Sequence, residues 1–170
     1  VGALPFYFSG EIPSFTDSLF EIISGFTTTG ASILLRVEDL SNGILFWRSF
    51  SHWIGGMGVL VFVLQILPMS SGQTMHLMRA ESPGPSVSKL VPRVRTTAFF
   101  LYGIYVMLTV LEIILLLLGR MPMFDAVCTA FGTAGTGGFG IRSDSIAGYS
   151  PYVQIVVTIF MMLFGTNFAF

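Results

Sequence analysis

The segment from Thr97 to Leu118 constrains the fold of this chain more than any other feature. It reads TAFFLYGIYVMLTVLEIILLLL and contains one charged residue, Glu112. A helix that crosses a hydrocarbon core about 30 Å thick needs about 20 apolar residues. The segment therefore predicts a transmembrane helix, in which every backbone polar group must be paired internally.

The composition agrees with a membrane protein. Of the 170 residues, 53% are hydrophobic and 10% charged, whereas soluble domains carry about 25% charged residues. This excludes a soluble globular domain and disfavours nucleic acid as a partner. The single cysteine, Cys128, is expected to be a small buried hydrophobe, because it has no second cysteine to pair with. A start at Val1 and an end within an apolar run at Phe170 predict an internal fragment.

Three further segments have the character of membrane spans. Ile44–Leu67 is long enough for one crossing, although Arg48, His52 and several glycines interrupt it. Tyr152–Phe170 begins another span, and Val1–Phe8 is expected to be the tail of an earlier one. The chain is thus predicted to be polytopic.

Two shorter segments, Ser14–Leu35 and Met123–Ile141, begin as apolar helices and end in Thr and Gly. A helix of about a dozen residues covers only about 18 Å, which is too short to cross a membrane. Pro13 precedes the first segment, while Pro122 and Asp125 mark the start of the second, as suits helix N-termini. Both segments are predicted to be re-entrant half-helices.

The two short segments form an internal repeat. Placing Asp17 over Asp125, an offset of 108, sets Thr28-Thr29-Gly30 over Thr136-Gly137-Gly138. A competing register sets the first triplet over Thr133-Ala134-Gly135 and loses the aspartate match. The aspartate-anchored register is preferred and Gly135 is the fallback, so Gly138→Ser is expected to impair the site more than Gly135→Ser.

The connector between the repeats predicts the orientation. With its flank, the stretch from Pro68 to Pro92 carries four basic residues against one acid, Glu81. The positive-inside rule places it in the cytoplasm, and both Thr/Gly loops then lie outside. The expected organisation is a first repeat at 1–68 (the end of an outer helix, a pore helix, a filter loop and an inner helix), a cytoplasmic connector at 69–92, and a second repeat at 93–170 with a truncated inner helix.

The Thr/Gly loops have the chemistry of a cation filter. A dehydrated cation needs replacement oxygens, which backbone carbonyls supply without trapping charge. Successive carbonyls can face one way only if some residues leave the usual backbone regions, and Gly does so at little cost. The candidate ligands are Thr28, Thr29, Gly30, Thr136, Gly137 and Gly138. Glycine-rich helix packing is the alternative for one such loop alone, but the repeat favours the filter.

Several charged or polar side chains leave two interpretations open. Arg48 either snorkels outward or braces the pore loop, and Glu112 has either a helix-packing or a pathway role. Glu21, with the nearby acids Asp17, Glu38 and Asp39, either concentrates cations at the mouth or is simply solvated. His52 suggests close helix contact. The Ser49, Ser51 and His52 cluster completes no catalytic triad, so an enzyme is not expected.

Four groups of residues resemble the TrkH/TrkG/KtrB family of potassium uptake proteins. They are the first loop at 24–32 (SGFTTTGAS), the helix motifs FWR at 46–48 and WIGGMG at 53–58, the connector motif RAESPGP at 79–85, and GGF at 137–139. The resemblance spans nearly the whole chain, and the connector motif is typical of the TrkH side of the family. The second loop departs from the first in having Thr136-Gly137 where the first has a Thr-Thr pair.

The resemblance implies an all-α membrane protein built from four helix–pore-loop–helix repeats, of which two are present. It implies K⁺ as the transported ion with no organic cofactor, the cytoplasmic membrane as the location, a homodimer, and a cytoplasmic nucleotide-binding ring of the TrkA or KtrA type. Transport of another substrate by an ion-coupled secondary transporter remains the alternative, although such half-helices usually belong to inverted repeats.

Overall fold

The structure, a computed structural model, describes residues 1–58 and 91–166, with side chains for 1–58 and 99–166. These residues form helices and no strands: α1 (Leu4–Phe8), α2 (Phe15–Phe26), the 3-10 helix η1 (Val37–Asp39), α3 (Asn42–Gly56), α6 (Val91–Leu118), α7 (Met123–Ala134) and α8 (Pro151–Gly165). The predicted all-α fold is confirmed. The connector motif at 79–85, the rest of the connector up to residue 90, and the predicted helical stretches 59–67 and 167–170 lie outside the described residues.

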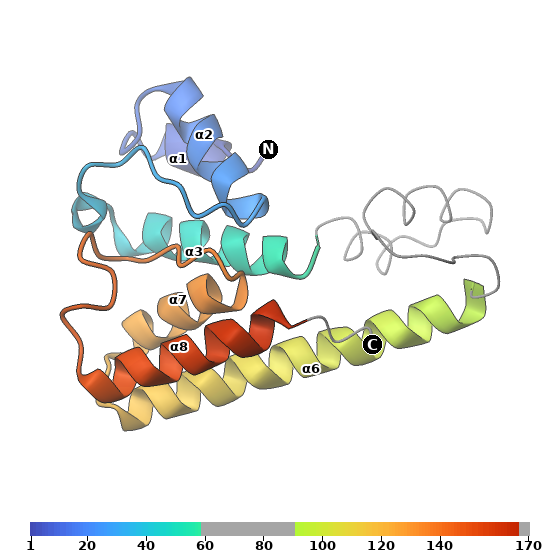
Figure 1. Cartoon of the computed structure of the whole chain (residues 1–170). Helices are drawn as coiled ribbons and strands as arrows, with labels where there is room; N and C mark the ends of the chain where they lie inside the picture. The colour runs from blue at the N-terminus through green and yellow to red at the C-terminus, as the bar shows by residue number, and fades with distance from the viewer. Residues whose placement is uncertain (59–90, 167–170) are drawn as a thin grey trace.

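The helices repeat along the chain at a nearly constant interval. Helices α2 and α7 have 12 residues each, and both ends of α7 lie 108 positions after those of α2. Helices α3 and α8 have 15 residues each and lie 109 positions apart. The segment between α7 and α8 is therefore one residue longer than the segment between α2 and α3. Figure 1 shows α3 and α8 running in the same direction and α6 running back, which is a parallel repeat.

Two predicted spans differ from the helices observed. Helix α6 begins at Val91 rather than Thr97, and its 28 residues extend for about 42 Å. The helix predicted over Ile44–Leu67 ends instead at Gly56. Gly58 follows with φ 73° and donates its N–H to the Gly55 carbonyl at 2.9 Å. This left-handed glycine is a common way for a helix to end, whereas from the sequence the glycines here were expected only to interrupt a longer span.

The short helices begin at the residues that the sequence predicted. Ser14 caps α2, because its hydroxyl accepts the Asp17 N–H at 3.3 Å. Pro122 occupies the N-cap of α7, and Asp125 lies in the first turn. The Asp125 carboxylate accepts a hydrogen bond from the Tyr149 hydroxyl at 2.7 Å, which ties α7 to the loop before α8. Both helices thus begin in fixed positions and end at the Thr/Gly loops.

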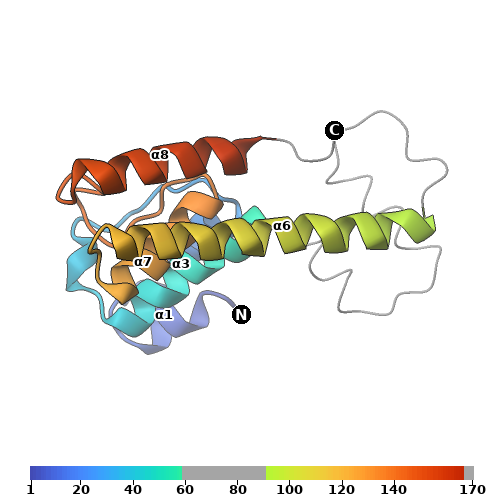
Figure 2. The same ribbon diagram turned by 90° about the horizontal axis from the view of Figure 1, so that it is seen from below.

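Helix α3 lies between the two short helices and packs on both (Figure 1). One buried cluster joins α1, α2 and α3 and includes Phe6, Ile22 and Leu45, together with Cys128 from α7. A second cluster joins α6, α7 and α8 around Leu116 and other residues, and Figure 2 shows α6 and α8 side by side. Cys128 is fully buried and unpaired, as expected.

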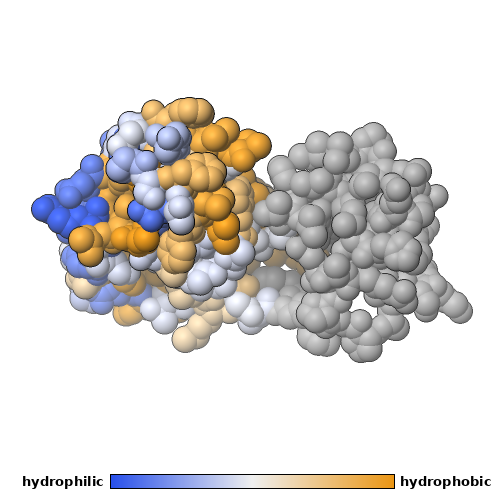
Figure 3. Space-filling view, turned by 90° about the horizontal axis from the view of Figure 1, so that it is seen from above, coloured by the Kyte–Doolittle hydropathy of each residue, from blue (hydrophilic) through white to orange (hydrophobic). Residues whose placement is uncertain are grey.

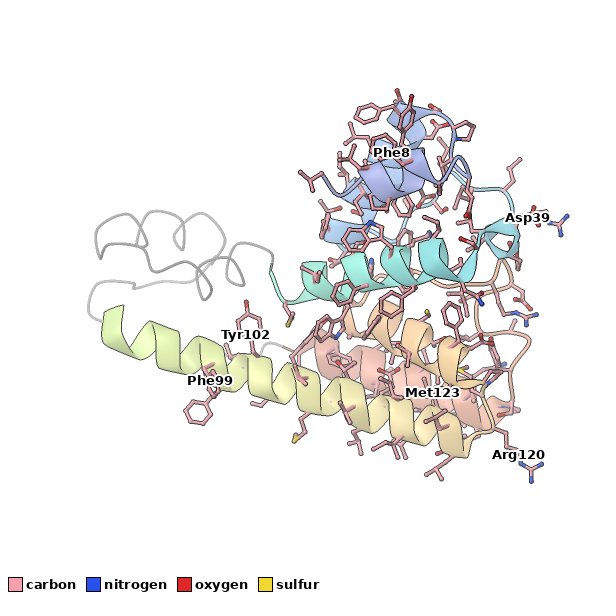
Figure 4. The ribbon with its side chains drawn as sticks, turned by 180° about the vertical axis from the view of Figure 1, so that it is seen from behind. Phe8, Asp39, Phe99, Tyr102, Arg120 and Met123 are labelled. Atoms are coloured by element: carbon pink, nitrogen blue, oxygen red, sulfur yellow. The ribbon has the colours of Figure 1, made fainter. Side chains whose placement is uncertain are left out.

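Polar residues gather at one end of the described part. Figure 3 shows a hydrophilic patch there, and a mixture of apolar and intermediate residues over most of the remaining described surface in view. In Figure 4, Asp39 and Arg120 project at this end, while Phe99 and Tyr102 lie far along α6. Phe99 and Leu118, at the two ends of the apolar part of α6, are 72% and 71% exposed. Phe99–Leu118 is the one helix in the described ranges long and apolar enough to cross a membrane.

Candidate cation-binding site

The two Thr/Gly loops lie directly against each other. A Cβ on Gly30 would lie 2.9 Å from the carbonyl carbon of Gly137. A Cβ on Gly137 would lie 2.6 Å from the carbonyl oxygen of Thr28. Only glycine permits so close an approach at these two positions. The structure therefore brings the two predicted triplets, 28–30 and 136–138, into one site.

The backbone conformation alternates along both triplets in the same way. Thr28 and Gly30 have φ of 54° and 73°, and Thr136 and Gly138 have φ of 59° and 68°. The middle residues, Thr29 and Gly137, do not have positive φ. Such alternation turns successive peptide planes so that their carbonyls face one side of the chain. Because the matching positions are 108 apart, the backbone follows the aspartate-anchored register, while Gly135 caps α7 with φ −73°.

The threonines with positive φ were not foreseen. From the sequence, left-handed conformations were expected of glycines alone, whereas Thr28 and Thr136 adopt them and Gly137 does not. Left-handed conformation costs an ordinary residue about 1–2 kcal/mol, and it is an outlier for a β-branched one. Backbone strain of this kind is concentrated at functional sites. Gly137 is required instead for the space between the loops.

The carbonyl oxygens of both triplets are free of hydrogen bonds to the part of the chain that the structure describes. Several of the N–H groups are held: Thr28 donates to Gly25 at 3.0 Å, Thr29 to Ser24 at 3.1 Å, and Thr136 to Thr133 at 2.8 Å. The acceptors belong to the last turns of α2 and α7. The loops therefore combine fixed amides with unused carbonyls, at helix ends that carry partial negative charge.

A buried ion pair joins the segments that follow the two loops. Arg48 of α3 and Glu21 of α2 are 2% and 0% exposed, with Nε 3.3 Å from Oε2. Arg48 also donates to the Gly140 carbonyl at 2.6 Å. The other Glu21 oxygen accepts the Ser32 hydroxyl at 2.5 Å and the Ile33 N–H at 2.9 Å. Arg48 thus braces the loops, and neither a cation-concentrating nor a solvated role for Glu21 is correct.

His52 contacts the second loop from behind. It is fully buried on α3, and its Nε2 accepts the Gly137 N–H at 3.2 Å. Its ring stacks on Phe139 with centroids 5.2 Å apart. Close helix contact was predicted for His52 from the sequence. The bond to the loop was not predicted, because nothing in the sequence relates position 52 to position 137.

The polar end carries a separate link between the repeats. Both carboxylate oxygens of Glu38 accept hydrogen bonds from Ser143, one from the hydroxyl and one from the N–H, each at 2.6 Å. These two bonds, that from the hydroxyl foremost, lower the pKa of Glu38 to about 2. Asp39 forms only an exposed pair with Arg36, at 3.5 Å. Glu38 therefore ties η1 to the loop before α8.

Glu112 is buried inside the helix bundle. Its side chain is fully buried near Thr133 of α7. The Thr133 hydroxyl donates to the Thr129 carbonyl at 2.9 Å, and neither Glu112 oxygen accepts a hydrogen bond from the described residues. Of the two roles left open by the sequence, this position agrees with helix packing.

Short helices that end in loops with unused carbonyls, set among longer apolar helices, define a pore-loop membrane protein. The chain belongs to the TrkH family of cation transport proteins, whose family model matches residues 1–170. The expected family and the location in a cell membrane are thereby confirmed.

Known proteins with similar sequences carry the same family name. The Trk system potassium uptake protein TrkH of Salmonella typhimurium is 43% identical over 172 residues, which cover 99% of this chain and 35% of that protein. TrkG of Escherichia coli is 37% identical over 171 residues, with 99% and 35% covered. The crystal structure of the potassium transporter TrkH from Vibrio parahaemolyticus matches with a TM-score of 0.76 at 34% identity, covering 98% of this chain and 33% of that one. The chain thus spans about a third of the length of these relatives.

Proposed function

We propose that this chain supplies two of the pore-loop repeats of a potassium uptake protein, and that the carbonyls of Thr28 to Gly30 and Thr136 to Gly138 coordinate K⁺. The observation that carries the proposal is the shared backbone alternation of the two triplets, whose carbonyls accept no hydrogen bond from described residues. The relatives that are named potassium uptake proteins support K⁺ as the ion.

The physical basis is replacement of the hydration shell. An ion that sheds water needs several oxygens at once, and neutral carbonyl dipoles provide them while still allowing it to leave. The C-terminal ends of α2 and α7 precede the triplets and add a favourable potential for a cation. The relatives are transporters rather than enzymes by name, and the site needs no organic cofactor for this role.

The proposed topology places the polar end of the described part outside the cell and the connector 69–92 in the cytoplasm. Residues 1–68 and 93–170 then form two repeats on either side of it, in a homodimer that binds a nucleotide-sensing ring from the connector side. The basic connector supports this orientation. Cysteine labelling of intact cells should modify Ala147→Cys, in an exposed loop, and spare Ser88→Cys. The reverse pattern would refute the orientation.

Ion fluxes test the function itself. The full-length protein in liposomes should take up labelled K⁺ far faster than labelled Na⁺, and K⁺ flux should persist without a gradient of Na⁺ or H⁺. A protein that moved neither ion by itself, or that moved K⁺ only with another substrate, would support an ion-coupled secondary transporter instead.

A further inference from the structure

His52 holds the middle amide of the second triplet from outside that repeat. Its Nε2 accepts the Gly137 N–H at 3.2 Å, through the lone pair of the ring nitrogen. His52 belongs to α3, the inner helix of the first repeat. A side chain of one repeat is therefore hydrogen-bonded to the candidate filter of the other.

This bond fixes the direction of a candidate ligand. A trans peptide unit is planar, and its N–H and C=O point in opposite directions. The Gly137 N–H shares its peptide unit with the Thr136 carbonyl. Because His52 holds the N–H on one side of the loop, the Thr136 oxygen must face the other side, away from α3.

In the first repeat, the short helix of that repeat itself holds the corresponding amide. There the corresponding amide, that of Thr29, donates to the Ser24 carbonyl of α2 at 3.1 Å. Ser24 corresponds to Gly132, whose carbonyl instead accepts the N–H of Gly138 at 3.2 Å. The Gly137 amide is thus left without an acceptor on α7, and His52 supplies one.

The imidazole is itself held in place. It stacks on Phe139, and the Arg48 guanidinium carbon lies 3.4 Å from the centroid of the same Phe139 ring. A Cβ on Gly135 would lie 2.9 Å from the His52 carbonyl oxygen, so the end of α7 fits closely against it. At the 109-residue offset, the counterpart of His52 in α8 is Met161.

We propose that His52 is a positioning residue of the filter: by accepting the Gly137 N–H it aims the Thr136 carbonyl at the ion and so contributes to the choice of K⁺ over Na⁺. This inference rests on the proposed function. His52 acts by orienting the loop and does not contact the ion directly.

Two variants of nearly equal shape separate this role from simple packing. Gln ends in an oxygen that can accept the Gly137 N–H, whereas Met has similar length and no comparable acceptor. Full-length wild type, His52→Gln and His52→Met are compared in liposomes by their K⁺/Na⁺ permeability ratio at matched protein yield. The Met variant should lose roughly fivefold in this ratio, as expected for one net hydrogen bond, and the Gln variant should retain most of it.

Each outcome decides one point. A Met variant with the wild-type ratio, or Gln and Met variants that lose selectivity equally, would overturn the positioning role while leaving the proposed function intact. A wild type that does not select K⁺ would overturn the proposed function itself. If the Met variant does not reach the membrane, His52→Asn replaces it, because its shorter amide cannot reach Gly137, and the same loss is expected.

Discussion

The Arg48 guanidinium carbon lies 3.4 Å from the centroid of the Phe139 ring. Arg48 belongs to the inner helix of the first repeat and Phe139 directly follows the second Thr/Gly triplet. The same guanidinium pairs with Glu21 of the first short helix. One cation therefore contacts the first short helix and the segment that follows the second triplet, and it holds the two repeats together next to the candidate filter.

Removing the acid of this pair should destabilise the protein strongly. Glu21→Gln leaves Arg48 buried with an uncompensated charge, which typically costs about 3–5 kcal/mol. The measurement is thermal or chemical unfolding of the full-length protein in detergent. Asp39→Asn is the matched control, because its pair with Arg36 is exposed (62% and 73%) and is expected to contribute about 1 kcal/mol or less. Equal losses in the two variants would contradict the bracing role.

The Glu38–Ser143 link should make stability fall in acid. Because the folded pKa of Glu38, about 2, lies below its ordinary value of 4.5, the link stabilises the fold fully above pH 4.5. This contribution is lost as the pH falls from 4.5 through 2, since the unfolded chain then binds the proton more readily. Melting temperatures between pH 6 and 2.5 measure the effect.

Two variants identify Glu38 as the source of that pH dependence. Glu38→Gln should make the melting temperature depend less on pH in this range. Ser143→Ala removes the hydroxyl that lowers the pKa of Glu38 most. The folded pKa then lies closer to 4.5, so the loss in acid should be smaller and should end at a higher pH in that variant. An acid profile unchanged in both would show that the link has no effect on stability.

Glu112→Gln should leave stability unchanged or raise it. The carboxyl group is buried with no hydrogen bond from the described residues, and Gln keeps its shape while removing a group that is costly to ionise inside a membrane. Unfolding of the full-length variant in detergent tests this. A loss of several kcal/mol would show that a cationic or donor group elsewhere in the protein pairs with Glu112.

The sequence predicted the elements of this fold because their signals are local. Apolar length indicated α6, and Pro and Ser marked the starts of the short helices. The 108-residue offset that matched Asp17 to Asp125 also governs the backbone of the two triplets. The early end of α3 could not be predicted with confidence, because a glycine within an apolar run is compatible with both a helix and a break.

The sequence could not predict the contacts that hold the loops. Glu21 and Arg48 are 27 positions apart in the sequence, and His52 and Gly137 are 85 apart. Only the packing of α3 between α2 and α7 brings the members of each pair together. That packing also changes the effect expected of Gly135→Ser, which the sequence predicted to be weaker than that of Gly138→Ser. Any Cβ on Gly135 would meet His52, so Gly135→Ser is expected to prevent folding.

Gly138, with Gly10 as its matched control, tests directly whether the carbonyls of the Thr/Gly loops coordinate the ion. Gly138 and Gly10 have φ of 68° and 75°, and a Cβ finds open space or only ordinary contact at both. Replacement by Ala should therefore cost each about 1 kcal/mol or somewhat more in backbone strain. Only Gly138 lies in a candidate ligand triplet.

The decisive measurement is the K⁺/Na⁺ permeability ratio of full-length Gly138→Ala and Gly10→Ala in liposomes. If the Thr/Gly carbonyls coordinate the ion, Gly138→Ala will admit Na⁺ while Gly10→Ala keeps the wild-type ratio at similar stability. Unchanged selectivity in a folded Gly138→Ala protein, or an equal loss in both variants, would contradict coordination of the ion by these carbonyls.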